Sequence, residues 1–246
     1  MTSADPDAAR GAPTPVRGRG APFTLPGRFR AVVFDMDGVL VDSEPLWARA
    51  EALLLARHGD RFTREDAVAT HGRSIEASVA IYASRLDGVD PADLRAELIE
   101  LMRLQYAAGV ALRPGAGALA RSLHGRVGLA VASNTDGELV RLALGQVGLL
   151  ESFGVIVSGA DLGRAKPDPA VYLAACDRLG VEPRDGVAIE DSPAGVQAAK
   201  AAGLTCIGIP ERKGVDLAGA GADVVVASLS DLIPSGRAPG RRGRTT

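Results

Sequence analysis

The chain has 246 residues, of which 46% are hydrophobic and 24% charged, a balance typical of a globular protein with a packed core. Its formal net charge of −2 gives no overall attraction for nucleic acid or for an anionic membrane surface, so neither is an expected partner. Its two cysteines, Cys176 and Cys206, lie within apolar patterns and lack the spacing of metal ligands or of a disulfide pair, which predicts two reduced thiols in the core.

Both ends of the chain lack the apolar periodicity of a folded domain. Residues 1–28 are rich in Ala, Pro, Gly and Arg and contain no apolar core of a signal peptide, which predicts a disordered extension. No part of the chain approaches the length of a membrane span, and we therefore expect a cytoplasmic protein. The tail 235–246 carries arginines between glycines. A weak nucleic-acid-binding arm is one interpretation of this tail, but we favour a solvated, disordered end.

The first predicted strand leads into two closely spaced acids. An apolar run over 31–34 is followed by Asp35, Met36, Asp37 and Gly38. In an extended chain, residues i and i+2 point to the same side, so the two aspartates can face one ligand. Two carboxylates so close repel each other unless a cation or a shared proton relieves them, which favours a Mg²⁺ site. The alternative is an ordinary Asp-Gly turn after a buried strand.

The stretch that follows has the periodicity of helices. Apolar residues recur at helical spacing within 46–54, 75–86 and 94–102. In the first of these segments they are Leu46, Ala50, Leu53 and Leu54. The stretch is far longer than a crossover between two strands needs, so we expect a small helical bundle inserted into another domain. Its entry near 41–44 and its exit near 109–114 are expected to form adjacent hinge strands.

Beyond residue 112, short β-branched runs alternate with helical patterns. Helices are expected over 115–124, 136–146, 169–180 and 193–201, and strands over 127–132, 154–158, 186–190, 204–209 and 223–226. This alternation predicts a parallel sheet covered by helices on both faces, a doubly wound α/β fold. In such sheets ligands bind beyond the carboxyl ends of the strands. Asp35, Ser133 and Asp191 stand at predicted strand ends and should therefore converge.

Four motifs occur in a fixed order along the chain. After the pair of aspartates come Val131-Ala-Ser133-Asn134, Gly163-Arg-Ala-Lys166-Pro-Asp-Pro169 and Val187-Ala-Ile-Glu190-Asp191-Ser-Pro-Ala-Gly195. With these motifs, over roughly 29–230, the sequence resembles the haloacid dehalogenase-like superfamily, and within it the branch of sugar-phosphate phosphatases and β-phosphoglucomutases with a helical cap. The resemblance implies a Rossmann-like core formed by residues 29–42 and 112–234, with a cap formed by residues 43–111.

The resemblance also implies a role for each acid. Asp35 would be the nucleophile that forms an aspartyl-phosphate, and Asp37 would be the general acid and base that protonates the leaving alcohol and then activates water. Mg²⁺ would be the cofactor. Its ligands would be Asp35, the backbone carbonyl of Asp37, Asp191 and, directly or through water, Glu190.

Phosphate binding is expected from the two central motifs. Ser133 and Asn134, at what looks like a helix start, would hold a phosphoryl oxygen through the hydroxyl and backbone N–H groups. Lys166 would neutralise phosphate and carboxylate together. Without the resemblance, these residues would be interpreted as a helix N-cap and a surface lysine.

Cap residues are expected to select the alcohol that is released, because a closing cap excludes water from the site. The candidates are Glu44, Trp47 and, in the loop 71–74, Arg73. Arg73 is open to three interpretations: a clamp on a second phosphate, a partner of a carboxylate, or a solvated loop residue. Trp47 either stacks on a sugar or packs the first cap helix.

The preferred interpretation is a Mg²⁺-dependent phosphatase that acts on a small phosphorylated metabolite, a sugar phosphate, as a monomer or weak homodimer. The alternative is a β-phosphoglucomutase. In mutases of that kind a histidine-containing motif lies twelve residues after the nucleophile, where this chain has Trp47. Dehalogenase activity is disfavoured, because those relatives lack the second aspartate, here Asp37. A catalytically silent binding protein would require a broken acid set, and none of the acids is missing.

Overall fold

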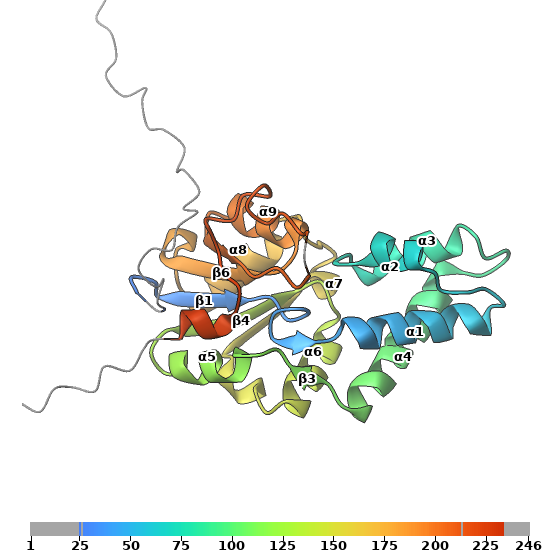
Figure 1. The fold of residues 1–246 in the computed structure, drawn as a ribbon, viewed down its shortest axis with the longest axis horizontal. Coiled ribbons are helices and arrows are strands. Elements are labelled where there is room, and N and C mark those ends of the chain that lie inside the picture. Colours follow the sequence, from blue (N-terminus) through green and yellow to red (C-terminus); the bar gives the residue numbers. More distant parts are fainter. Residues whose placement is uncertain (1–24, 26, 213, 234–246) are drawn as a thin grey trace, which may run out of the picture.

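The computed structural model describes residues 25, 27–212 and 214–233, with a six-stranded parallel sheet at the centre (Figure 1). Its strands are β1 (Ala31–Phe34), β4 (Gly128–Ser133), β5 (Val155–Ser158), β6 (Gly186–Glu190), β7 (Thr205–Gly208) and β8 (Val224–Val225). Their order is β5-β4-β1-β6-β7-β8. Because β1 lies between β4 and β6, the sheet extends from β1 in both directions, as in a doubly wound fold. The predicted fold class is confirmed.

Helices cover both faces of the sheet (Figure 1). On one face lie α5 (Ala116–Leu123) and α6 (Gly137–Gln146), and on the other lie α8 (Ala170–Leu179) and α9 (Pro193–Ala201). The alternation of side chains along β1 serves both faces, since Val32 and Phe34 pack into one apolar cluster and Val33 packs into the other. Strands that are apolar on both sides are what a doubly covered parallel sheet requires.

Short helices that the sequence pattern did not predict complete the core. They are α7 (Gly159–Leu162), which follows β5, and the 3₁₀ turns η1 (Leu150–Ser152), η2 (Pro183–Asp185) and η3 (Leu229–Leu232). Each is too short to show a helical period in the sequence.

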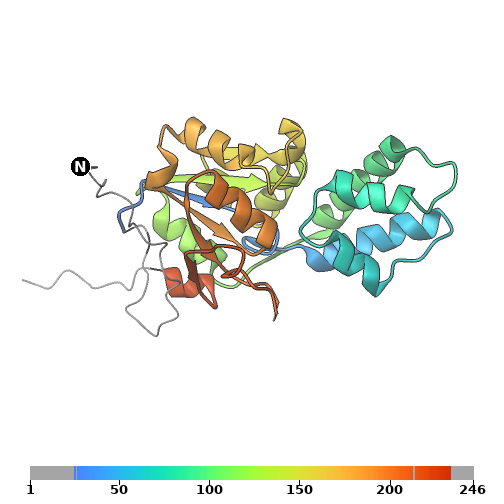
Figure 2. The same ribbon diagram turned by 90° about the horizontal axis from the view of Figure 1, so that it is seen from above.

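The inserted segment forms a helical cap to one side of the sheet (Figure 2). Its helices are α1 (Glu44–Arg57), α2 (Arg64–Thr70), α3 (Ile75–Ala83) and α4 (Pro91–Ala108). One detail of the predicted packing is wrong: Leu53 is 42% exposed, whereas Leu54 and Leu55 are fully buried. The buried face of α1 consists of Ala50, Glu51, Leu54 and Leu55, and Leu53 lies outside it. Glu51 is an acid, so an apolar pattern does not indicate its place on this face.

A two-stranded hinge connects the cap with the core. β2 (Val41–Asp42) and β3 (Ala111–Leu112) pair in antiparallel register, with Val41 opposite Leu112. The entry and the exit of the cap therefore lie side by side, as the sequence predicted. The chain leaves and re-enters the core at this hinge. The cap also contacts the core beyond it, where Arg103 of α4 donates to Glu138 of α6 at 3.1 Å.

The two ends of the chain are described only in part. Residues 1–24 and 234–246 lie outside the described residues, so the predicted disorder of the extension and the tail stays a prediction. Leu25, within the segment expected to be disordered, instead packs into the core: it is 1% exposed, and its N–H donates to the Leu232 carbonyl at 3.3 Å. Burial of an apolar side chain in the core stabilises the folded state. The composition of residues 1–28 as a whole did not indicate that one leucine within them is buried.

Two further expectations concern the cysteines and the membrane. Cys176 and Cys206 are both free and buried, as predicted. In the part of the chain that the structure describes, no helix combines the length and the apolar character needed to cross a bilayer.

Candidate active site

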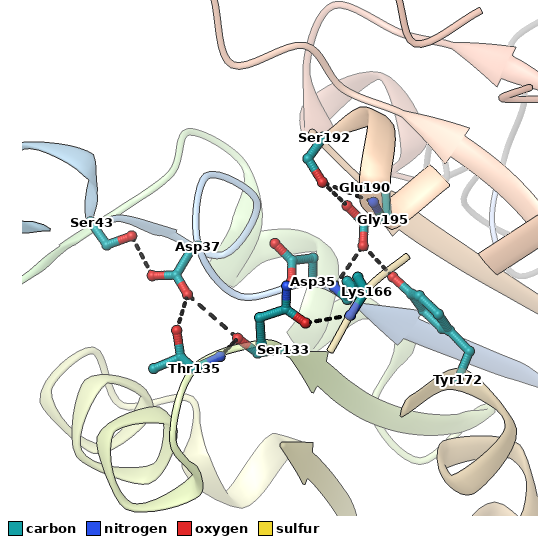
Figure 3. A network of polar contacts seen from close by, with 11 residues as sticks. Asp35, Asp37, Ser43, Ser133, Thr135, Lys166, Tyr172, Glu190, Ser192 and Gly195 are labelled. Atoms are coloured by element: carbon teal, nitrogen blue, oxygen red, sulfur yellow. Dashed lines mark hydrogen bonds and ion pairs between the residues drawn. The ribbon is translucent and has the colours of Figure 1, made fainter. Parts of the chain in front are cut away.

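The core residues predicted to act together meet at the carboxyl edge of the sheet. Asp35 directly follows β1, Ser133 is the last residue of β4, and Glu190 is the last residue of β6 and precedes Asp191. Because β1 pairs with β4 on one side and β6 on the other, these strand ends are neighbours. Lys166 reaches between them from the loop before α8 (Figure 3). This is the point where strand order changes direction, the usual ligand site of such sheets.

A buried lysine joins two of the acids. The Lys166 ammonium donates to Asp35 Oδ1 and to Glu190 Oε1, both at 2.6 Å, and its side chain is only 4% exposed. Burial alone would lower the pKa of Lys166, but the two carboxylates outweigh it and raise that pKa above its ordinary value. Lys166 is therefore a buried partner of two acids, not the surface lysine that the motif would otherwise suggest.

The carboxylate of Glu190 accepts hydrogen bonds from three side chains. It is completely buried, and its carboxylate accepts hydrogen bonds from the Tyr172 hydroxyl and, at 3.3 Å, from Ser192 Oγ, besides the one from Lys166. Gly195 makes room for it: a Cβ there would stand 2.0 Å from the Glu190 carboxylate carbon. The glycine in the fourth motif is thus explained by the close approach of a charged side chain to helix α9.

Three acids form a cluster suited to a cation. Ligand atoms of Asp35, Glu190 and Asp191 all lie within 4.8 Å of one another. Burial, followed by the neighbouring carboxylates, raises the pKa of Asp191 well above its usual range, and burial likewise raises that of Asp35, with Lys166 opposing. Buried carboxylate oxygens that repel one another fit a hard divalent ion. Gly38 permits this proximity, since at φ +74° a Cβ there would lie 2.0 Å from Asp191 Oδ2.

The carboxylate of Asp37 faces the hinge and the cap as well as the core. Its Oδ1 accepts from three groups of the hinge and cap, namely Ser43 Oγ at 2.5 Å, Trp47 Nε1 at 3.1 Å and the Tyr106 hydroxyl at 3.1 Å. Its Oδ2 accepts from two groups of the core, namely Thr135 Oγ1 at 2.8 Å and Ser133 Oγ at 3.4 Å. One carboxylate therefore connects the β4 end with helices α1 and α4.

Ser133 and Asn134 line the pocket, and their role in phosphate binding stays a prediction. Asn134 Oδ1 accepts from the backbone N–H of Lys166 at 2.7 Å, so this side chain fixes the loop that carries the lysine. Ser133 Oγ, besides its bond to Asp37, accepts from the backbone N–H of Thr135 at 3.0 Å. The helix that follows is capped by Asp136, so the expected helix start lies beyond Ser133.

A pocket extends from these acids to the cap. It is lined by Asp35, Asp37 and Asp191 from the core and by Glu44, Trp47 and Arg73 from the cap, among other residues. All the cap residues that the sequence singled out therefore face this pocket. The exposed Arg73 lies in the loop between α2 and α3.

A polar contact between cap and core lies at the pocket. His71 Nδ1 lies 2.9 Å from Glu44 Oε1, and His71 Nε2 lies 3.8 Å from Oε2 of Glu211, a residue of the core. The hydrogen bond with Glu44 raises the pKa of His71, while burial opposes it. Protonated His71 would thus link the cap to the core.

Sequence reasoning missed several hydroxyl groups of the site. Tyr172, which donates to Glu190, looked like an apolar position of helix α8. A tyrosine on a fully buried helix face does carry a signal, because its hydroxyl needs a polar partner there. Tyr106, which is buried on helix α4, carries the same signal. Thr135 gave no comparable signal, since its partner Asp37 is far away in the sequence.

Comparison with known proteins shows the family of this chain. Residues 29–203 match the family described as haloacid dehalogenase-like hydrolase. Hexitol phosphatase B of Escherichia coli (strain K12) is 36% identical over 219 residues, which cover 85% of this chain and 97% of that protein. The β-phosphoglucomutase of Bacillus subtilis (strain 168) is 31% identical over 215 residues, covering 82% and 91%.

Among solved structures, CbbY from Rhodobacter sphaeroides in complex with phosphate superposes with a TM-score of 0.74 at 31% identity, over 82% of this chain and 95% of that one. The chain belongs to the haloacid dehalogenase-like hydrolases, as its four motifs indicated.

The close approach of Glu190 to helix α9 gives a first prediction. We expect Gly195→Ala to displace the carboxylate and to destabilise the protein by about 1–3 kcal/mol, as overpacking of a filled interior does. The measurement is the midpoint of urea unfolding. The control is Gly145→Ala in α6, where a Cβ meets nothing within 4 Å. There we expect a gain of roughly 0.5–1 kcal/mol from helix propensity. Equal stability of the two variants would contradict the packing described for Glu190.

Proposed function

We propose that this hydrolase is a Mg²⁺-dependent phosphatase that releases phosphate from a small phosphorylated metabolite, a sugar phosphate, through an aspartyl-phosphate at Asp35. The observation that carries the proposal is the buried ion pair of Asp35 with Lys166, placed beside two further acids and next to Asp37. A carboxylate nucleophile, a fixed cation and a separate carboxyl group for proton transfer are the parts that phosphoryl transfer needs.

In the first step, an oxygen of Asp35 attacks phosphorus, and the bond from phosphorus to the sugar oxygen breaks. Lys166 holds the other oxygen of Asp35 in place and offsets the negative charge that gathers between carboxylate and phosphate. Asp37 gives a proton to the departing alkoxide, so that a neutral alcohol leaves. In the second step, water attacks phosphorus, Asp37 takes a proton from it, and the Asp35 carboxylate is released with inorganic phosphate.

The donor set of the acid cluster supports the choice of metal. Asp35, Asp191, Glu190 and the Asp37 carbonyl offer oxygen ligands, which Mg²⁺ prefers, together with substrate phosphate. Mg²⁺ would supply charge neutralisation for the transferring phosphoryl group. The residues themselves orient the nucleophile and exclude solvent, since Asp35 and Asp191 are both more than nine-tenths buried.

A mutase is the second candidate, because a β-phosphoglucomutase is among the relatives. Trp47 is the residue that favours hydrolysis. It occupies the position of the mutase histidine in the resemblance, and its indole N–H donates directly to Asp37. An indole nitrogen only donates and does not titrate, whereas a histidine exchanges protons near neutral pH. Asp37 therefore has a permanent donor from the cap, whose contact does not depend on pH.

The first test distinguishes the two reactions. We expect β-glucose 1-phosphate with glucose 1,6-bisphosphate to yield mainly inorganic phosphate, because Asp37, the proposed base for the attacking water, already contacts Trp47 of the cap before a sugar binds. A coupled assay compares phosphate released with glucose 6-phosphate formed, and Asp35→Asn serves as the blank for both. If glucose 6-phosphate forms much faster than phosphate, the mutase is the correct assignment.

The proton transferred by Asp37 gives a second test. We expect Asp37→Asn to slow hydrolysis of sugar phosphates by about 10²–10⁴-fold, the usual contribution of general acid–base catalysis. Nitrophenolate leaves without a proton, so the first step with p-nitrophenyl phosphate should be affected much less. The burst of nitrophenolate in stopped-flow measurements reports this step. Equal losses on both substrates would argue against proton transfer by Asp37.

Metal binding should depend on pH with a definite sign. The pKa values of Asp35 and Asp191 are raised in the folded protein, so the protonated forms of both groups favour the folded state at low pH. This contribution to the free energy of unfolding is lost as pH rises through the raised pKa values. Bound Mg²⁺ favours the charged carboxylates. We therefore expect Mg²⁺ to raise the melting temperature, and more so near pH 8 than near pH 6. Asp191→Asn should reduce this shift. A shift of the same size at both pH values would rule out the carboxylate cluster as its origin.

A further inference from the structure

A buried acid in the cap, Glu51, lines the same pocket as the catalytic residues. It lies on the buried face of α1 and is only 5% exposed. Around it the cap contributes Phe62, Thr70 and Ser78 to the pocket wall. The pocket is continuous from Asp35 to this wall, so a molecule with its phosphate at Asp35 extends its organic part toward Glu51.

Glu51 is poorly satisfied by the protein. Among the described residues, no Lys, Arg or His lies within ion-pair distance of its carboxylate. The hydrogen bond from Thr70 Oγ1 is long, at 3.4 Å, and the same hydroxyl lies closer, at 3.0 Å, to the Asp66 carbonyl. A hydroxyl has one proton, so it cannot serve both acceptors fully. The Tyr82 hydroxyl interacts with Glu51 but does not meet hydrogen-bond geometry.

The surroundings of Glu51 also disfavour the charged form of its carboxyl group. Burial raises the pKa of Glu51 to about 7, and the charges of Glu44 and Asp66 act in the same direction, whereas the hydroxyl groups of Tyr82 and Thr70 oppose the shift. Asp66 itself has a cation, Arg85, which donates to it through two hydrogen bonds of 2.6 and 3.1 Å. Glu51 thus contributes little to the stability of the cap, because a buried carboxylate without a cation costs free energy.

We propose that Glu51 is the residue that selects the leaving alcohol, by accepting hydrogen bonds from hydroxyl groups of a polyhydroxylated substrate. Hydroxyl donors would supply the partners that the protein does not give this carboxylate. A second phosphate or a carboxylate at the same place would be repelled by Glu51 and Glu44. The substrate class is therefore an uncharged polyol or sugar that carries a single phosphate. This inference rests on the proposed phosphatase function and extends it to the recognition of the alcohol.

The test compares substrates with and without hydroxyl groups. Sorbitol 6-phosphate and p-nitrophenyl phosphate are assayed with wild type, Glu51→Gln and Glu51→Leu. For Glu51→Leu, kcat/KM for sorbitol 6-phosphate should fall about 10–100-fold, as expected when hydrogen bonds to a charged group are lost, mainly through KM. For p-nitrophenyl phosphate it should stay within about twofold. Glu51→Gln should show a smaller loss, because an amide oxygen still accepts hydrogen bonds.

The matched control is Glu97→Gln, which changes another acid of the cap that pairs with Arg57 and His58 away from the pocket. It should leave both substrates unaffected. A purely structural role of Glu51 would instead lower the melting temperature and reduce turnover of both substrates equally, and that result would overturn the proposal. Unchanged kinetics with sorbitol 6-phosphate would overturn it as well.

A binding measurement separates this inference from the proposed function. Calorimetric titration of sorbitol 6-phosphate into Asp35→Asn, with and without Glu51→Leu, reports recognition without turnover. We expect binding to weaken at least tenfold in the double variant. If the wild type hydrolyses neither substrate, the phosphatase assignment fails, yet weaker binding in the double variant would still support the role of Glu51. Equal binding by the two variants would refute that role.

Discussion

The ammonium group of Lys166 lies between Asp35 and Glu190, and the arrangement of the other acids depends on it. Buried carboxylates cannot remain charged side by side without a cation, since removing one partner of a buried ion pair typically costs about 3–5 kcal/mol. Lys166 in turn depends on its loop, which Asn134 holds through the backbone N–H at 2.7 Å. The second, third and fourth motifs are therefore parts of one polar network, although they are widely separated in the sequence (Figure 3).

The second constraint is the position of Asp37 between two parts of the fold. Its carboxylate accepts from the core through Thr135 and from the cap through Trp47 and Tyr106. A change in the angle of the hinge must alter at least one of these bonds. The group proposed to transfer the proton is thus coupled to the position of the cap, while Asp35 is held by core residues alone. This division fits a hydrolase in which the core carries the phosphoryl chemistry and the cap selects the alcohol.

Much of this organisation follows from local sequence patterns. Short β-branched runs predicted the strands of the sheet, and the meeting of Asp35, Ser133 and Asp191 followed from the topology of parallel sheets. Other features depend on tertiary contacts that no local pattern encodes. Leu53 has the expected apolar character but is 42% exposed, since the buried face of α1 consists of Ala50, Glu51, Leu54 and Leu55. The contact of the Asn134 side chain with the backbone N–H of Lys166 joins two motifs that are 32 residues apart, so it could not be predicted locally. The partners of Asp37 come from three separate segments, and their convergence requires the hinge geometry.

The account depends most directly on a covalent phosphate at Asp35. Turnover of a sugar phosphate is quenched in acid, the protein is reduced with borohydride, which converts an aspartyl-phosphate to homoserine, and its peptides are analysed by mass spectrometry. The account predicts homoserine at position 35 only when substrate and Mg²⁺ are both present, and none at Asp37 or Asp191. An unmodified Asp35 in samples that release phosphate at full rate, despite rapid quenching, would contradict it.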